Sequence, residues 1–189
     1  MFANRFTAFI DACSLVPTLS RNLLLSLAEA GFFRVRWSER VLDETEAAIA
    51  KVTDAKGLPD AVVRARTSRE AIEEAFPDAA VTGYEVLVAG LGALPDPGDA
   101  HVIAAAIKTR AAVIVTENLK DFPAAVLEPL DIEAKSADAF IADTIGLDPG
   151  RAVAAVRQMR ERFKKPSKTA EVLLLDMEAA AHTDCGRPP

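Results

Sequence analysis

Four acidic residues stand at points where the local pattern predicts the end of a strand, the start of a helix or the body of one. Asp11 directly follows the apolar run 6–10, and Asp121 lies in the loop after the apolar run 112–115. Asp99 follows Pro-Gly at a predicted helix start, and Glu44 lies two turns into another predicted helix. Two carboxylates about 4 Å apart repel by about 4 kcal/mol at an effective dielectric of ~20, so convergence of these four would require a cation. Mg²⁺ and Mn²⁺ prefer such ligands, and a site of this kind hydrolyses phosphodiesters.

Each of these acids also has a purely structural explanation. Asp11 could be a turn residue, Asp99 a helix cap and Glu44 a solvent-facing helix residue, while Asp121 could cap the helix that follows it. Asp96, in the same LPDPGD stretch as Asp99, is a rival for its role or only shapes the turn. The prediction of a metal site therefore depends on the set of residues rather than on one of them.

The elements that would position these acids alternate between strands and helices as far as residue 134. Apolar runs predict strands at 6–10, 33–37, 112–115 and 130–134. Strands that are apolar on both faces and alternate with helices indicate an α/β fold with a mainly parallel central sheet. Ligands of open parallel sheets bind at the carboxyl ends of the strands, where Asp11 and Asp121 are expected.

Helix signals occupy most of the remaining chain. The pattern predicts a helix over 19–30 that Gly31 ends, one over 38–52 capped by Ser38, and one reaching residue 76 with an interruption near 67–68. A further helix runs from about 98 to 110, and residues 81–94 stay ambiguous between strand and helix.

Beyond residue 134 the pattern is purely helical. This change of pattern predicts a domain with the central sheet over 1–134 and a helical C-terminal extension over 135–189. Helices are expected from Ser136, from Asp148 and from Ser167. Residues 151–168 carry seven Lys and Arg against one acid, within a chain of net charge −6. One basic segment on an acidic body is typical of nucleic-acid contact, and a solvated helix face is the alternative. The outward-facing candidates for RNA binding are Arg157, Arg160, Lys164 and Lys165.

Composition excludes several other classes of protein. Half of the 189 residues are hydrophobic, so a core can form, while no apolar run is long enough to cross a membrane and the start lacks an export pattern. We therefore expect a cytoplasmic protein. Two distant cysteines, Cys13 and Cys185, predict neither a disulfide framework nor a zinc site, and neither His101 nor His182 has a second ligand at metal spacing. No phosphate-binding glycine motif is present.

Four motifs, in order along residues 5–134, resemble those of PIN-domain nucleases. FIDACSL is similar to the opening motif, which ends its strand at Asp11. Residues 21–38 followed by VLDE are similar to a bacterial branch in which the glutamate, here Glu44, is a metal ligand. LPDPGDAHVIAAAI resembles the third motif, with Asp99 as ligand, and VIVTENLKDFP resembles the last, with Asp121. The resemblance implies a PIN-like α/β/α sandwich.

The chain departs from the family pattern at two places. Asn118 stands where many PIN domains have an aspartate, so Asp121 is expected to supply the missing carboxylate. Cys13 stands where a hydroxyl is common two residues after the first aspartate, and Ser14 is the candidate substitute. The resemblance also implies supporting roles, which fall on Asp96, Thr116, Asn118, Ser14 and Arg21.

The extension resembles that of some VapC-type toxins, which implies a Mg²⁺- or Mn²⁺-dependent endoribonuclease that a co-encoded antitoxin neutralises. Its expected partners are the RNA substrate and the antitoxin, and a homodimer is a further expectation. The alternatives are a housekeeping PIN nuclease for RNA maturation and a non-catalytic RNA- or protein-binding module of the same fold. A phosphatase of the haloacid dehalogenase type also begins with a strand and an aspartate, but it requires a second aspartate where this chain has Cys13.

Overall fold

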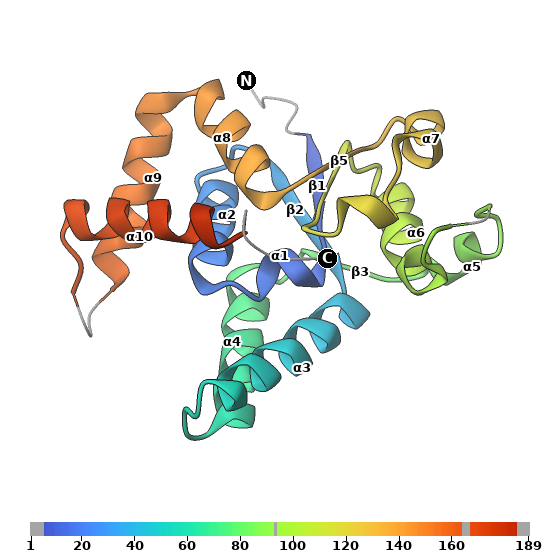
Figure 1. The fold of residues 1–189 in the computed structure, drawn as a ribbon. Helices are drawn as coiled ribbons and strands as arrows, with labels where there is room; N and C mark the ends of the chain where they lie inside the picture. Colours follow the sequence, from blue (N-terminus) through green and yellow to red (C-terminus); the bar gives the residue numbers. More distant parts are fainter. Residues whose placement is uncertain (1–5, 93, 164–166, 185–189) are drawn as a thin grey trace.

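Five short parallel strands form the centre of the computed structural model (Figure 1), which describes residues 6–92, 94–163 and 167–184, the last five of these as backbone only. The strand order is β3-β2-β1-β4-β5, so the chain winds outward from β1 in both directions. The strands are β1 (Thr7–Ile10), β2 (Arg34–Ser38), β3 (Ala80–Val81), β4 (Val113–Val115) and β5 (Glu133–Lys135). The order reverses between β1 and β4, which is the position where open α/β sheets bind their ligands.

Helices cover both faces of this sheet. In chain order they are α1 (Ala12–Leu15), α2 (Thr18–Glu29), α3 (Glu39–Ala55), α4 (Ala61–Ala75), α5 (Glu85–Val88), α6 (Ala100–Thr109), α7 (Ala124–Leu127), α8 (Ala137–Leu147), α9 (Pro149–Arg162) and α10 (Ala170–Asp184). Three single turns of 3-10 helix join them: η1 (Pro97–Asp99), η2 (Leu119–Asp121) and η3 (Glu128–Leu130). Helix α6, whose first seven residues are all buried, packs against four strands on one face, and α2 with α8 covers the other (Figure 1).

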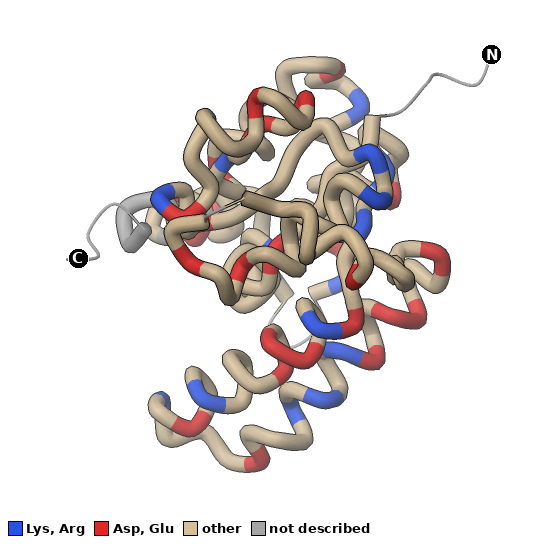
Figure 2. The backbone as a smooth tube through the Cα atoms, turned by 90° about the vertical axis from the view of Figure 1, so that its right-hand side faces the viewer, with Lys and Arg blue, Asp and Glu red and all other residues tan. Residues whose placement is uncertain are grey.

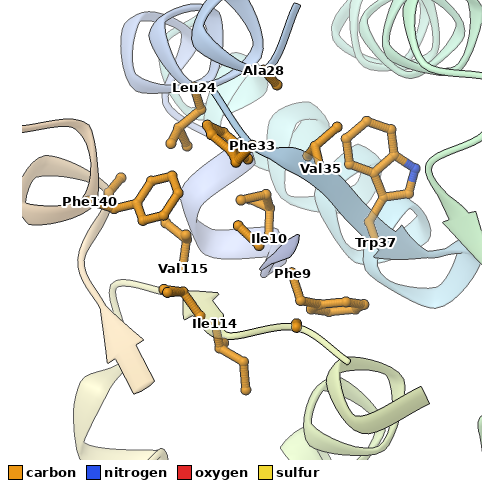
Figure 3. Close-up of a cluster of buried hydrophobic side chains, with 14 of the residues drawn as sticks. Phe9, Ile10, Leu24, Ala28, Phe33, Val35, Trp37, Ile114, Val115 and Phe140 are labelled. Atoms are coloured by element: carbon orange, nitrogen blue, oxygen red, sulfur yellow. The ribbon is translucent and has the colours of Figure 1, made fainter. Parts of the chain in front are cut away.

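The core lies on both sides of the central strands, as Figure 3 shows. All four residues of β1 are buried, because a strand between two helix layers exposes neither face to water. Leu24 of α2 and Phe33 point into the layer on one side of the sheet, while Phe9 and Ile114 point to the other (Figure 3). The edge next to β3 is closed by Trp37, whose ring meets that of Phe76 edge-on with centroids 5.9 Å apart.

The C-terminal helices α8, α9 and α10 share this core rather than forming one of their own. Phe140 of α8 packs edge-on against Phe33, with ring centroids 4.9 Å apart, and against Phe6 at 6.1 Å. The Arg151 guanidinium lies 4.3 Å from the centre of the Phe32 ring and donates two hydrogen bonds, of 3.0 and 2.8 Å, to the Ala30 carbonyl. The extension is therefore fastened to the end of α2 by packing and by polar contacts.

Helices α3 and α4 form an antiparallel pair that projects from the body, with charges of both signs along it (Figures 1 and 2). Arg69 of α4 joins the two helices, because it lies within ion-pair distance of Glu39, Asp43 and Glu46 on α3 and bonds to Glu73 on its own helix. Hydrogen bonds to Asp43, which contributes most, and to Glu73 and Glu46 raise the pKa of Arg69. The ion pairs of Arg69 therefore hold the N-terminal half of α3, which carries Glu44, against α4.

The α/β fold with a parallel sheet and a helical C-terminal part is confirmed. The expected interruption near 67–68 is wrong: α4 is continuous, and the Ser68 hydroxyl donates to the Arg64 carbonyl one turn earlier. The last helix begins at Ala170 rather than at Ser167, because Thr169 caps it by accepting from the Val172 amide. The ambiguous stretch 81–94 contains the end of β3 and the short α5.

Candidate functional site

Asp11 lies at the point where the strand order reverses. It follows β1, and its backbone amide donates to the Val115 carbonyl at the end of β4 at 2.9 Å. Thr116, which directly follows Val115, is thereby placed beside Asp11. The fold thus brings the first and the last sequence motifs together at the carboxyl edge of the sheet.

Three donors hold the Asp11 carboxylate, which is 7% exposed. The Thr116 hydroxyl donates to Oδ2 at 2.8 Å, and the Cys13 thiol donates to the same oxygen at 3.1 Å. The Ala12 amide donates to Oδ1 at 2.7 Å. Burial, followed by the charge of Asp11, raises the pKa of the Cys13 thiol to about 12, so this thiol stays protonated and remains a donor. Both Thr116 and Cys13 thus donate to the same oxygen of Asp11, and the supporting role of Thr116 stays a prediction.

The carboxyl group of Asp99 is affected by the negative charges of four other acidic residues. Burial, followed by the charges of Asp11, Asp96, Asp121 and Glu44 in that order, raises its pKa from 3.8 to about 6. The structure thus brings all four predicted carboxylates, together with Asp96, within electrostatic reach of one side chain. Asp99 is also the last residue before α6, where its side chain makes no capping hydrogen bond.

The surroundings of Asp99 fit a bound cation. Its Oδ2 atom is buried and has no hydrogen-bond partner among the described residues. A buried carboxylate oxygen without a donor is costly and therefore rare in folded proteins. The oxygen set of this edge is the kind that Mg²⁺ and Mn²⁺ prefer, and a divalent ion would remove both the unpaired oxygen and the repulsion.

Glu44 faces this edge from α3 and is held by two neighbours. The Arg40 Nε atom donates to Glu44 Oε1 at 3.0 Å, and a guanidinium nitrogen of the same Arg40 donates to the Gly98 carbonyl at 3.3 Å. The Nε2 atom of His101 lies 3.4 Å from the same Glu44 oxygen. Burial lowers the pKa of His101, so the imidazole is neutral at pH 7.

The loop after β4 holds Asp121 through Asn118. The Asn118 side-chain amide donates to Asp121 Oδ2, and the Asn118 backbone amide donates to the Thr116 hydroxyl. Asp96 differs from Asp121, since its Oδ1 accepts from the Gly98 amide at 2.7 Å and so shapes the turn before Asp99. The same oxygen would lie only 2.9 Å from a Cβ atom at position 98, so any other residue there would displace the Asp96 side chain.

The side chains of two supporting candidates bond to groups other than the four acids. The Ser14 hydroxyl donates to Glu117 Oε1 at 3.4 Å, and this Glu117 oxygen also accepts from the Ala137 amide at the start of α8 at 2.9 Å. Arg21 is buried and donates to the carbonyls of Leu15 and Val16, so its guanidinium supports the end of α1. Ser14, close to Asp11, is therefore joined through Glu117 to the start of the extension.

Much of the basic segment 151–168 makes contacts within the chain. Arg162 forms an ion pair with Glu29 at 2.7 Å, and Lys168 forms one with Asp176. Arg160 is half-buried and donates to the Lys168 carbonyl at 3.1 Å. Arg157 lies on the exposed side of α9, while Lys164 and Lys165 lie outside the described residues.

Among the residues that the structure describes, no three His, Cys, Asp or Glu side chains are already grouped as the ligands of one metal ion. The carboxylates are turned instead to donors of the protein: Asp11 to Thr116, Glu44 to Arg40, and Asp121 to Asn118. These hydrogen bonds fix the orientation of each carboxylate in the metal-free protein.

Sequence reasoning missed three residues of this edge. His101 was considered only as a zinc ligand, although its place two residues after Asp99 puts it in the same helical turn. Arg40 had a usable signal, because it lies one turn before Glu44 on the same helix face. Glu117 had no local signal, because its partners are Ser14 and the start of α8.

Comparison with known proteins agrees with this geometry. Residues 7–120 match the family model of the PIN domain, and residues 137–183 match that of the VapC50 C-terminal domain. The chain is 38% identical over 92 residues to VapC50 of Mycobacterium tuberculosis (strain ATCC 25618 / H37Rv). The name of that relative describes it provisionally as a ribonuclease. This alignment covers 49% of the chain and 53% of the relative, so the chain spans about half the length of the curated relative that it matches. No solved structure matches the chain.

The chain belongs to the PIN-domain family, whose model covers more than half of its residues. Its helical C-terminal part is of the kind found in VapC50. The resemblance to VapC-type PIN proteins with a helical extension is thereby confirmed. No helix within the described ranges is long and apolar enough to cross a membrane.

Proposed function

We propose that this protein is a Mg²⁺- or Mn²⁺-dependent endoribonuclease and the toxin of a toxin–antitoxin pair. The observation that carries the proposal is that the charges of Asp11, Glu44 and Asp121 all act on Asp99, whose buried Oδ2 has no hydrogen-bond partner among the described residues. Asp11 itself lies at the point where the order of the parallel strands reverses. Membership of the PIN family and similarity to VapC50 support the same activity.

The proposed roles of the residues follow from their places. Asp11, Glu44, Asp99 and Asp121 would hold the cation, and Thr116 and Cys13 keep the Asp11 carboxylate oriented. A bound Mg²⁺ or Mn²⁺ would neutralise charge on the scissile phosphate and lower the pKa of a hydrolytic water. The acids alone would repel RNA, so the substrate must be held by basic side chains elsewhere.

The toxin role rests on kinship and requires an antitoxin partner and an RNA target, which would place the protein in the cytoplasm. A housekeeping PIN nuclease would have the same chemistry without an antitoxin. Induced expression separates them: a toxin should arrest growth, the product of an adjacent antitoxin gene should relieve the arrest, and RNA ends should map to a few defined cuts. Growth without arrest, but with altered RNA maturation, would favour the housekeeping nuclease. A protein that binds RNA without cutting it would be the non-catalytic module.

Arg157, Arg160, Lys164 and Lys165 remain the proposed RNA-binding set of the extension. Contacts to phosphates release counterions, so the logarithm of affinity falls with that of salt by roughly 0.7 per phosphate on single strands. RNA binding by the Asp11→Asn protein should weaken at low salt, with a flatter salt slope, when the four are replaced by Gln. Arg66, exposed on α4 and paired with Glu70, provides the control. Equal slopes for the fourfold variant and the Arg66→Gln control would assign RNA binding to another surface.

A further inference from the structure

His101 occupies an unusual position between the helices that carry two of the proposed ligands. It lies in the first turn of α6, two residues after Asp99, and only 4% of it is exposed. Its Nε2 atom lies 3.4 Å from Oε1 of Glu44, which belongs to α3. The imidazole therefore connects the helix that follows Asp99 to the carboxylate of Glu44.

The two nitrogens of the ring differ in their surroundings, since Nε2 faces the Glu44 carboxylate and Nδ1 does not. Its Nδ1 atom is buried and has no hydrogen-bond partner among the described residues. In a neutral imidazole one nitrogen carries the proton and the other is an acceptor. With the proton on Nε2, the ring presents a donor to Glu44, whereas a proton on Nδ1 would leave a buried donor unpaired and two acceptors facing each other.

Arg40 completes the same arrangement from the other side. It donates to the Glu44 oxygen that His101 faces, and it also donates to the Gly98 carbonyl just before Asp99. Both neighbours thus approach Glu44 Oε1, and both are joined to the segment that carries Asp99. The orientation of Glu44 relative to Asp99 is set by these contacts between helices.

We infer that His101 is a positioning residue that holds the Glu44 carboxylate in the orientation needed to share a divalent cation with Asp99. The inference rests on the proposed function, because it takes Glu44 and Asp99 as ligands. A glutamate side chain loses rotamer freedom when it becomes a ligand, and a partner that fixes it beforehand reduces that loss. Partners of this kind typically change metal affinity by about 10–100-fold.

The test is Mn²⁺ binding to the RNA-free protein, measured by titration calorimetry. His101→Leu fills the buried space but removes the donor, and it should weaken Mn²⁺ binding by about 10–100-fold. His101→Gln keeps a side-chain N–H and should restore most of the affinity. In a Glu44→Gln background, His101→Leu should add less than about twofold, because the carboxylate it positions is already gone. Ile103→Val, a fully buried change on the same helix, should lower stability and leave Mn²⁺ affinity unchanged.

Wild-type Mn²⁺ affinity in folded His101→Leu would overturn the inference, as would equal weakening in the Glu44→Gln background. If His101→Leu fails to fold, His101→Asn, whose shorter amide does not reach Glu44, replaces it under the same criteria. Asp11→Asn and Asp99→Asn separate the two levels of the proposal. Wild-type Mn²⁺ affinity in both would refute the metal site itself, whereas loss of affinity in both beside an unaffected His101→Leu would refute only the role of His101.

Discussion

Asp99 should destabilise the metal-free protein, so Asp99→Asn should stabilise it. Burial and the neighbouring acids raise the pKa of Asp99 from 3.8 to about 6. At about 1.4 kcal/mol per pKa unit, ionising this carboxyl in the folded state costs at most about 3 kcal/mol at pH 7. The residue is half-buried, so solvent reduces that figure, and Asn gives up a helix-dipole contribution of about 0.3–1 kcal/mol. A net gain of about 1–2 kcal/mol is expected.

The pH dependence follows from the direction of the shift. Because the folded-state pKa lies above the unfolded one, the penalty is absent below pH 4, grows as pH rises from 4 to 6, and is complete above pH 7. Urea unfolding in EDTA at pH 4.5 and 7.5 should show the advantage of Asp99→Asn mainly at the higher pH. Asp138→Asn, an exposed acid in the first turn of α8 that is not among the charges acting on Asp99, is the matched control and should give no such gain.

Saturating Mg²⁺ should reverse the order, since a ligand stabilises only the protein that binds it. Wild type should gain stability with Mg²⁺ and Asp99→Asn should gain little. A loss of stability in Asp99→Asn at pH 7.5 without metal would refute the electrostatic reasoning. A gain of equal size at both pH values would refute it too.

Three further changes test other parts of the structure. Phe140→Ala should lower the free energy of unfolding by about 3–5 kcal/mol in one cooperative urea transition, because α8 shares the main core; a second transition would indicate an independent extension. Glu117→Ala removes the acceptor of the Ala137 amide and should cost about 0.5–2 kcal/mol by the same assay, and an unchanged midpoint would contradict that role. Asp121→Ala should raise the Mg²⁺ concentration for half-maximal RNA cleavage more than Asp96→Ala, and the reverse order would mean that Asp96 is the ligand.

The central strands and their acids were predictable because local sequence determines them. The apolar runs that end at Ile10 and Val115 are long enough only for buried strands, and in parallel strands their ends must meet. Ser38 caps α3 as predicted, by accepting from the Val41 amide at 3.2 Å. Where Asp11 and Asp99 would lie followed from these elements and from the motif resemblance together.

Contacts between helices were not predictable, because no local pattern records them. Arg40 meets Gly98 across 58 positions of sequence, and His101 meets Glu44 across a similar separation. The packing of α6 and α3 around the sheet determines both contacts. The predicted interruption of α4 was wrong because of a local contact. The Ser68 hydroxyl bonds to a carbonyl one turn earlier in the same helix, so Ser68 continues the helix instead of ending it.

The central claim is that the acidic edge binds a divalent cation that supports RNA hydrolysis. The most direct measurement is cleavage of defined RNA by purified protein over a Mg²⁺ and Mn²⁺ series, with Asp11→Asn in parallel and EDTA as the blank. The wild-type protein should cut only with metal, and Asp11→Asn should lose more than the 10–100-fold typical of residues that only support a ligand. Cleavage in EDTA, or near wild-type cleavage by folded Asp11→Asn in Mg²⁺, would contradict the claim.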